Sequence, residues 1–165
     1  MTQPLLIILM GSKSDLTHCE KIATAAQEFG LDTVMRISSA HKTPAHLLER
    51  LREYEADPRP KVYMTVAGRS NALSGFVDGY VQAPVIACPP PSDTFGGADI
   101  YSSLRMPSGI APGVVLDPAN AALLAAKILG LHNEQVRAKV AAFQQDKREQ
   151  LLSADADITS SGNNL

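Results

Sequence analysis

A glycine, two serines and an aspartate follow directly after an apolar run, and they are the first residues along the chain that could do chemistry. Leu5 to Met10 is apolar, Gly11 to Asp15 reads Gly-Ser-Lys-Ser-Asp, and a helical pattern begins afterwards. A strand, a tight turn and a helix start would direct backbone N–H groups and the positive end of a helix dipole at one point. We therefore interpret the stretch as a phosphate cradle, although serine and aspartate are also ordinary helix-capping residues.

Two further loops gather polar side chains, each after a predicted strand. Ser39-Ala40-His41-Lys42 follows the second strand, and Gly68-Arg69-Ser70-Asn71 follows the third. An imidazole titrates near neutral pH and can move a proton. These residues also have plainer explanations: His41 could only bond a neighbouring carbonyl, and Lys42 and Arg69 could be solvated surface charges. Together, the three loops predict a site for a small phosphorylated molecule with a group that exchanges a proton.

The elements that must position these loops alternate between strand and helix. Apolar, often β-branched runs predict strands at about 5–10, 33–38, 61–66, 84–88 and 113–116. Helical patterns occupy about 16–29, 44–57, 69–80, 99–104 and 118–129. This alternation predicts an α/β fold, a three-layer αβα sandwich with a central parallel sheet of the flavodoxin-like or Rossmann-like kind. In such sheets ligands bind outside the carboxyl ends of the strands, where all three loops lie.

The end of the chain departs from this pattern. We expect an α/β catalytic domain over 1–132, a long C-terminal helix over 133–152 and a disordered, polar tail over 153–165. The helix has one thin apolar stripe, formed by Val136, Val140 and Phe143. Such a stripe is too narrow for burial in a core of its own. It would lie across another subunit or the rim of its own sheet, and of the two we expect a neighbouring subunit.

The composition excludes several classes of partner. The 165 residues carry 15 basic and 17 acidic side chains, so no basic field exists to hold a nucleic-acid backbone. No apolar run approaches the roughly 20 residues that a membrane helix needs, and the first residues lead straight into a strand without a targeting segment. We expect a cytoplasmic protein that binds neither nucleic acid nor membrane.

The cysteines and the other histidines suggest no metal site. Cys19 and Cys88 lack the spacing of a zinc site or a redox pair, and we expect both to be buried thiols in a reducing compartment. His18, His46 and His132 fall on predicted helices or helix ends without a partner cluster, so we interpret them as structural. We expect neither a metal nor a cofactor.

Four stretches resemble the PurE family of purine biosynthesis in their order and spacing. They are Gly11 to Asp15, Ser39 to Pro44, Ala67 to Asn71 and Ser102 to Gly109. The resemblance covers roughly Leu5 to Leu131, and four linked motifs are far more specific than any single one. It implies a homo-octamer, with active sites completed by neighbouring chains.

The family contains a mutase class and a carboxylase class. The mutase, which rearranges N-carboxyaminoimidazole ribonucleotide, typically has Ser-Ala-His-Arg in the second loop and Ala-His-Leu-Pro-Gly after the third strand. Here Lys42 replaces that arginine, and Arg69 to Gly75 reads Arg-Ser-Asn-Ala-Leu-Ser-Gly. Both departures are similar to the carboxylase class, class II. The resemblance therefore implies reversible carboxylation of 5-aminoimidazole ribonucleotide with carbon dioxide, without ATP, metal or biotin.

The resemblance and the side-chain chemistry together suggest a role for each residue. His41 would move the proton that leaves carbon 4 of the imidazole, and Asp15 would accept hydrogen bonds from the ribose. The other substrate-binding residues are expected to be Gly11, Ser12, Ser14 and Lys42 around the phosphate, Gly68, Ser70 and Asn71 around the carboxylate or carbon dioxide, and also Ser39, Ala40 and Arg69. Two alternatives stay open: a mutase of the same fold, and a non-catalytic nucleotide-binding module.

Overall fold

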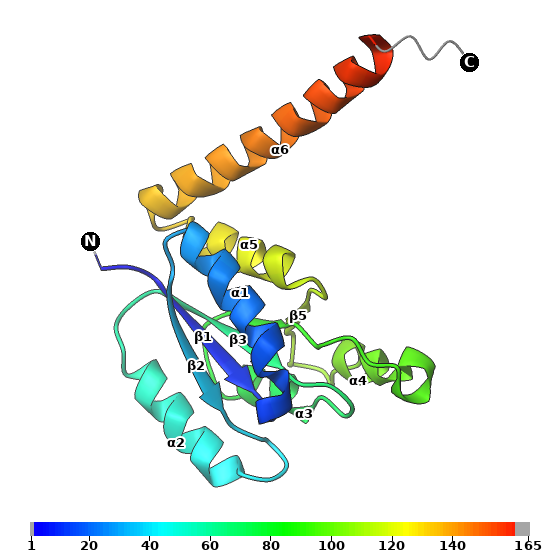
Figure 1. The fold of residues 1–165 in the computed structure, drawn as a ribbon. Helices are drawn as coiled ribbons and strands as arrows, with labels where there is room; N and C mark the ends of the chain where they lie inside the picture. Colours follow the sequence, from blue (N-terminus) through cyan, green and yellow to red (C-terminus); the bar gives the residue numbers. More distant parts are fainter. Residues whose placement is uncertain (1, 161–165) are drawn as a thin grey trace.

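Five parallel strands form the centre of the computed structural model, which describes residues 2–160 (Figure 1). They are β1 Leu5–Met10, β2 Asp32–Ile37, β3 Lys61–Val66, β4 Val85–Ala87 and β5 Gly113–Val114. Their order across the sheet is β2-β1-β3-β4-β5, and every pairing is parallel. From β1 the chain moves outward to β2, then crosses back to β3 on the other side of β1 and continues outward to β4 and β5. This reversal of direction places a topological switch point between β1 and β3. The predicted α/β fold is confirmed.

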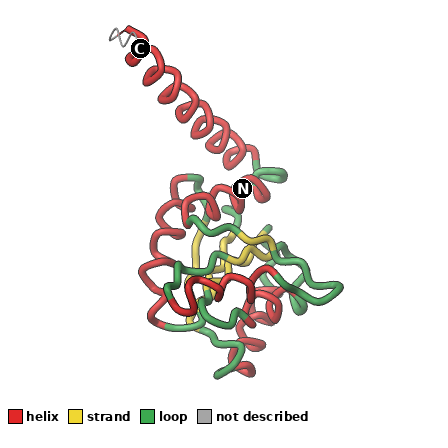
Figure 2. The backbone as a smooth tube through the Cα atoms, turned by 90° about the vertical axis from the view of Figure 1, so that its right-hand side faces the viewer, coloured by secondary structure: helices red, strands yellow, loops and turns green. Residues whose placement is uncertain are grey.

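Helices cover both faces of the sheet (Figure 2). The α-helices are α1 Leu16–Glu28, α2 Pro44–Glu55, α3 Ala72–Asp78, α4 Tyr101–Leu104, α5 Pro118–Leu129 and α6 Glu134–Ser160. Apolar side chains of α1 and α5 pack on one face, and those of α2 and α3 pack on the other. Two 3₁₀ segments, η1 Lys13–Asp15 and η2 Thr94–Ile100, lie in loops that follow strands.

Strand β1 is buried along its whole length and contributes to both cores. Leu6, Ile8 and Met10 face α1 and α5, whereas Leu5, Ile7 and Leu9 face α2 and α3. Side chains alternate between the faces of a strand, so a strand covered on both sides must be apolar at every position. This requirement explains why its sequence is a continuous apolar run.

The third and fourth predicted helices differ from the structure. Helix α3 begins at Ala72, because Arg69 adopts a positive φ of 57° and keeps the preceding residues in a loop. The segment before α4 is a kinked 3₁₀ turn in which Phe95, Gly96 and Gly97 all have positive φ. The predicted helix at 99–104 therefore begins within the last residues of this 3₁₀ segment, and α4 itself spans Tyr101–Leu104.

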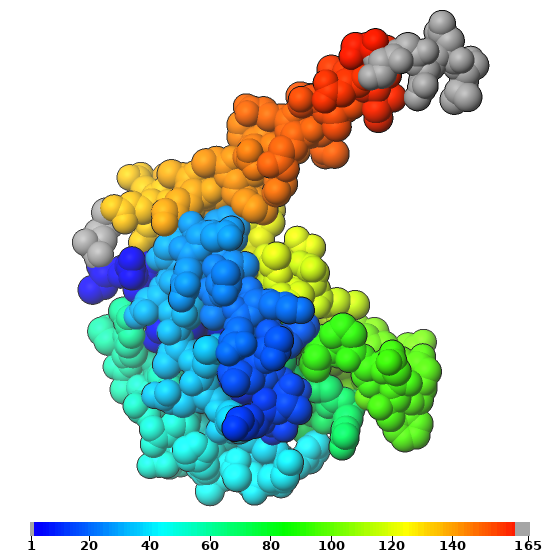
Figure 3. Space-filling model, viewed as in Figure 1, coloured from blue at the N-terminus to red at the C-terminus, as the bar shows by residue number. Residues whose placement is uncertain are grey.

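Helix α6 corrects two expectations about the end of the chain. The helix continues to Ser160, so the expectation of a disordered tail is wrong for 153–160; the remaining predicted tail, 161–165, lies outside the described residues. The second expectation was that the apolar stripe lies across a neighbouring subunit. Instead, Val136 and Val140 are buried in the chain's own core, and the Phe143 ring meets Phe29 edge-on at 5.3 Å between centroids. A narrow stripe is enough to hold the first part of α6, because it joins the core formed by α1 and α5 instead of forming a new one. Beyond this stripe α6 extends away from the domain (Figures 1 and 3).

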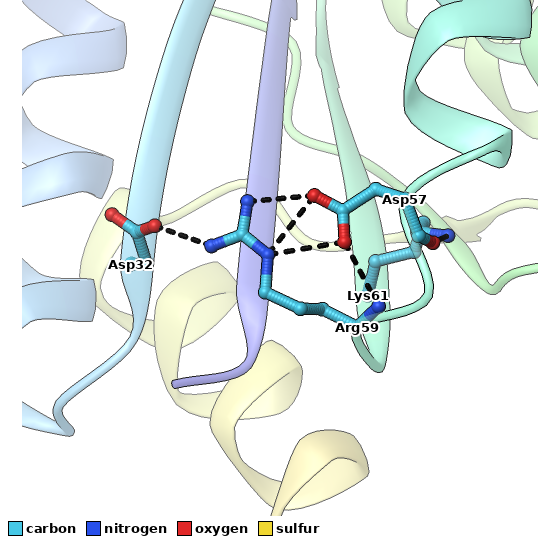
Figure 4. A network of polar contacts seen from close by, with 4 residues as sticks. All are labelled: Asp32, Asp57, Arg59 and Lys61. Carbon is cyan, nitrogen blue, oxygen red and sulfur yellow. Dashed lines mark hydrogen bonds and ion pairs between the residues drawn. The ribbon is translucent and has the colours of Figure 1, made fainter. Parts of the chain in front are cut away.

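An ion-pair network joins the starts of β2 and β3, at the end of the sheet opposite the polar loops (Figure 4). The Arg59 guanidinium lies 2.6 Å from Asp32 and 2.7 Å from Asp57, and Lys61 donates to the Asp57 carbonyl. Hydrogen bonds from Arg59 lower the pKa of the Asp57 carboxyl to about 2. The network therefore links the segment before β3 to the edge strand β2.

The depressed pKa of Asp57 predicts how stability changes with pH. A group whose pKa is lower in the folded state stabilises it above the unfolded pKa, and this contribution is lost as the pH falls through the folded pKa. We expect Asp57→Asn to melt below the wild type at pH 6, with the difference shrinking below about pH 4 and vanishing only as the pH falls below about 2. Thermal unfolding followed by circular dichroism measures this. Asp155→Asn, which changes an exposed carboxylate on α6, is the control. A difference that stayed constant from pH 6 to pH 2 would contradict the assignment.

Candidate active site

A cavity of about 690 Å³ lies at the carboxyl ends of β1, β2, β3 and β4. Four loops line it, through residues Gly11, Ser12, Ser14 and Asp15, then 39–42, then 67–70, then 90–94. Every residue predicted for the site except Asn71 is among them. Three loops that are separate in the sequence therefore share one cavity, as the rule for parallel sheets requires.

The first loop is held by its own serines. The Ser12 hydroxyl accepts hydrogen bonds from the Ser14 N–H at 3.3 Å and from the Ser14 hydroxyl at 3.0 Å. Gly11 donates its N–H to the Val66 carbonyl at 2.9 Å, which ties the start of the loop to β3. Ser12 thus caps the 3₁₀ turn, as the plainer interpretation expected, while it also lines the cavity. The two interpretations of this motif are compatible.

Asp15 is the carboxylate of this loop, and its pKa is raised. Burial is the main cause, since it disfavours the charged form. The Ser12 backbone, the Ser14 side chain and the nearby charges of His18 and Arg69 act in the opposite direction. A half-buried carboxyl with these neighbours is suited to accept hydrogen bonds from hydroxyl groups.

The second loop is a closed turn that presents His41 and Lys42. Ser39 accepts a hydrogen bond from the Lys42 N–H at 3.1 Å through its hydroxyl, and its own N–H donates to the Thr43 hydroxyl at 3.0 Å. These bonds satisfy backbone donors just before α2 begins at Pro44. His41 and Lys42 are exposed residues of the turn, and both line the cavity. The backbone of the turn is therefore ordered without using the side chain of either His41 or Lys42.

The third loop has a strained residue at the cavity. Arg69 has φ of 57°, a left-handed conformation that costs a residue with a Cβ roughly 1–2 kcal/mol. Ser102, in α4, supports this loop: its hydroxyl accepts from the Asn71 N–H at 3.0 Å and lies 2.9 Å from the Arg69 carbonyl oxygen. The motif at 102–109 thus contributes to the site by holding the 69–71 turn.

Asn71 is the one predicted site residue that lies outside the cavity lining. Its side chain is 4 % exposed and does not line the cavity. The Oδ1 atom accepts from the Ser74 N–H at 3.1 Å and caps α3, while Nδ2 donates to the Ser103 hydroxyl at 2.9 Å. Both polar groups of the amide are therefore used to join α3 to α4. From the sequence, a helix cap and a ligand-binding amide cannot be told apart.

Two parts of the cavity wall were missed by the sequence analysis. The loop after β4 contributes Pro90, Pro91, Ser92, Asp93 and Thr94, and α3 contributes Leu73. The signal was present, since this loop follows a predicted parallel strand just as the other three do. Its prolines indicate only an irregular segment, and no charged pair stands out. Within residues 2–160, no three histidine, cysteine or acidic side chains gather into a group that could hold a metal ion.

The match to a family model decides what this cavity belongs to. The model described as AIR carboxylase matches residues 5–150, which include every loop of the cavity. The chain belongs to the AIR carboxylase family. In the part of the chain that the structure describes, this family member has no helix long and apolar enough to span a membrane.

Individual relatives agree with this family over nearly the whole chain. The chain is 56 % identical over 156 residues to the phosphoribosylaminoimidazole carboxylase of Treponema denticola, covering 94 % of this chain and 98 % of that one. It is 58 % identical over 152 residues to the Archaeoglobus fulgidus protein of the same name, covering 92 % and 83 %. A bifunctional carboxylase and succinocarboxamide synthetase of Rattus norvegicus is 45 % identical over 153 residues, 93 % of this chain and 36 % of that protein. The crystal structure of Treponema denticola PurE superimposes with a TM-score of 0.92 at 56 % identity, covering 94 % of this chain and 98 % of that one.

The position of Asn71 predicts a loss of stability without a loss of substrate affinity. Asn71→Ala removes an N-cap worth about 1 kcal/mol and leaves the buried Ser103 hydroxyl without its donor. We expect a lower melting temperature and, well below it, a Michaelis constant within about twofold of the wild type. Asn71→Asp, which keeps the capping oxygen, should lose less stability. A Michaelis constant raised tenfold at unchanged stability would instead place Asn71 against the substrate.

Proposed function

We propose that this protein carboxylates 5-aminoimidazole ribonucleotide directly with carbon dioxide, giving 4-carboxy-5-aminoimidazole ribonucleotide in purine biosynthesis. The observation that best supports this activity is the 56 % identity to a curated carboxylase over 94 % of this chain. The cavity is consistent with it, because hydroxyls, a carboxyl, an imidazole and cations share one space of about 690 Å³. The reduced cysteines, Cys19 and Cys88, fit the cytoplasm that we propose as its compartment.

The reaction needs little beyond orientation and a proton acceptor. The substrate's aminoimidazole is an enamine, so its carbon 4 is already nucleophilic and attacks the carbon of carbon dioxide. A carbon–carbon bond forms, one C=O pair moves onto oxygen to give the carboxylate, and the proton on carbon 4 then leaves to restore the aromatic ring. Holding the two reactants together supplies much of the acceleration. We propose that the reaction is reversible and uses no ATP, metal or biotin.

The cavity residues suggest how the substrate is held. The N–H groups and hydroxyls at Ser12 and Ser14 would bind the phosphate, with Lys42 nearby and the raised-pKa carboxyl of Asp15 accepting from the ribose. His41 would take the proton from carbon 4 and return it in the reverse direction. Ser70 and the Gly68 backbone would orient the carboxylate. Asn71 would act one step removed, through the α3 cap described above.

One assay separates the carboxylase from its two rivals. Purified protein is given aminoimidazole ribonucleotide with bicarbonate, and separately the N-carboxy compound with free carbon dioxide trapped. We expect turnover in the first mixture, because Lys42 and the 69–75 stretch follow the carboxylase pattern. Turnover in the second mixture alone would identify a mutase. Turnover in neither would favour a non-catalytic nucleotide-binding module.

The role of His41 gives a prediction about rate rather than affinity. We expect His41→Asn to lower the turnover number by ~10²–10⁴-fold, the usual value of general acid–base catalysis, with the Michaelis constant within about tenfold. His46→Asn, on the outer part of α2 and outside the cavity, is the matched control and should keep wild-type rates. A His41→Asn enzyme that turned over normally would make His41 a structural residue.

Exposed apolar side chains support the homo-octamer that the family resemblance implies. Two groups of large apolar residues are more than half exposed: Phe95, Tyr101 and Leu104 around α4, and Leu151, Leu152 and Ile158 on the distal half of α6; Leu116 and Leu131 are exposed singly elsewhere. Both regions project from the domain (Figures 1 and 3). Such surface is costly in a monomer, and symmetric assembly would bury it. We propose that copies of this chain cover these regions and complete one another's sites.

The distal half of α6 can be tested without disturbing the core. Deleting everything from Asn133 would also remove Val136 and Val140 from the core, so it would destabilise the domain as well as the assembly. Replacing Leu151, Leu152 and Ile158 by serine changes only exposed residues. We expect a smaller assembly by size-exclusion chromatography with light scattering, whereas serine at Lys147, Gln150 and Asp155 should leave it intact. An unchanged assembly in the first variant would show that this half of α6 takes no part.

A further inference from the structure

A histidine and a cysteine that the proposed chemistry does not use contact each other at the carboxyl end of the sheet. We call this contact the link. The His18 Nε2 atom on α1 lies 3.4 Å from the Cys88 sulfur, directly after β4. The Cys88 thiol in turn donates to the Leu116 carbonyl at 3.6 Å. A thiol has one proton, so Nε2 of His18 carries the proton of the first bond, and the chain of donors runs from His18 through Cys88 to Leu116. The residues are 70 positions apart in the sequence, so no local pattern pairs them.

Burial disfavours the charged form of both members of this pair. It raises the pKa of the Cys88 thiol to about 12 and lowers the pKa of His18. Lys21 acts on the pKa of His18 in the same direction as burial, whereas a hydrogen bond to the Cys88 backbone and the charges of Asp15 and Asp117 act against it. With the Cys88 thiol protonated, the imidazole N–H donates to its sulfur, so the contact is a structural hydrogen bond rather than a thiolate pair.

The loop that begins after Cys88 is fixed mainly by contacts at its two ends. Residues 89–91 are three consecutive prolines, which have no backbone N–H to donate. The loop is therefore anchored beyond them, where the Ser92 hydroxyl donates to Asp99 at 2.8 Å and accepts from the Thr94 N–H at 3.2 Å. At its start the anchor is Cys88, whose N–H donates to Thr65 at 2.9 Å and whose sulfur contacts His18 and Leu116.

His18 connects this loop to the opposite wall of the cavity. It lies three residues after Asp15, so both side chains are on the same side of the helix start. Asp15 lines the cavity as part of the first loop, and Pro90 to Thr94 line it from the loop after β4. The separation between these two walls is thus set partly by the contact between His18 and Cys88.

We propose that His18, acting through Cys88, is a positioning residue. It holds the loop after β4, residues 89–94, at a fixed distance from the first loop, residues 11–15, on the opposite wall of the cavity. His18 itself does not line the cavity, so it acts on substrate only through these two loops. The proposal rests on the proposed function, because the two walls are the surfaces that would close around the ribonucleotide. A cavity held open at the right width before binding costs less to order when the substrate enters.

The test compares substitutions at both ends of the link. His18→Leu removes the donor, whereas His18→Gln places an amide N–H near the position of Nε2 and should rescue it. We expect His18→Leu to raise the Michaelis constant for aminoimidazole ribonucleotide by about 3–10-fold while the turnover number stays within about twofold, since His41 lies on another loop. Cys88→Ala should give a similar increase. The double variant should add little to either single change, because both remove the same contact.

The controls separate this role from general damage and from the proposed function. His132→Leu makes the same chemical change at an exposed histidine after α5 and should leave both kinetic constants unchanged. Calorimetric binding of aminoimidazole ribonucleotide without bicarbonate should show the same 3–10-fold loss, and it needs no turnover. A wild type that binds but does not turn over would overturn the proposed function and leave the link testable. The link itself is overturned if His18→Leu lowers only the melting temperature, if glutamine fails to rescue, or if the two single effects add.

Discussion

The site depends on the parallel pairing of β1 with β2 on one side and with β3 on the other. In this register Met10 stands opposite both Ile37 and Val66, so the three strands end at one level of the sheet. Backbone bonds continue the pairing one residue further, with Ser38 donating to Met10 at 2.8 Å and Gly11 donating to Val66 at 2.9 Å. Each loop therefore leaves the sheet beside the next. A slip of one register would turn every side chain of a strand to the other face, and the cores on both faces of β1 prevent it.

Several residues in these loops hold the backbone and line the cavity together. The Ser12 and Ser39 hydroxyls accept from backbone N–H groups within their own turns, so they are ordered before any ligand arrives. Arg69 is held in a left-handed conformation by contacts that reach from α4. Strain of this kind persists only where the surroundings fix it. An arrangement ordered in advance is what a reaction that relies on orientation and a single proton transfer requires.

The predictability of the chain follows from how local each signal is. The strand β1 and the helix α5 were read correctly because a continuous apolar run and an alanine-rich stretch between Asp117 and Gly130 each identify their element alone. The convergence of three loops followed from the rule for parallel sheets. The burial of the Asn71 amide could not be predicted locally, because its partner Ser103 is 32 residues away. The packing of α6 could not be predicted either, because its apolar stripe contacts Phe29 and the core formed by α1 and α5. The contact of His18 with Cys88 is non-local in the same sense.

A crystal structure of this protein with aminoimidazole ribonucleotide bound tests the central claim most directly, namely that the carboxyl ends of β1, β2 and β3 form one active site. The account predicts the phosphate within hydrogen-bonding distance of the Ser12 and Ser14 hydroxyls. It also predicts the ribose hydroxyls at Asp15 and the imidazole ring turned so that carbon 4 faces His41. A phosphate bound away from the Gly11 to Asp15 loop, or a ring whose carbon 4 points away from His41, would contradict it.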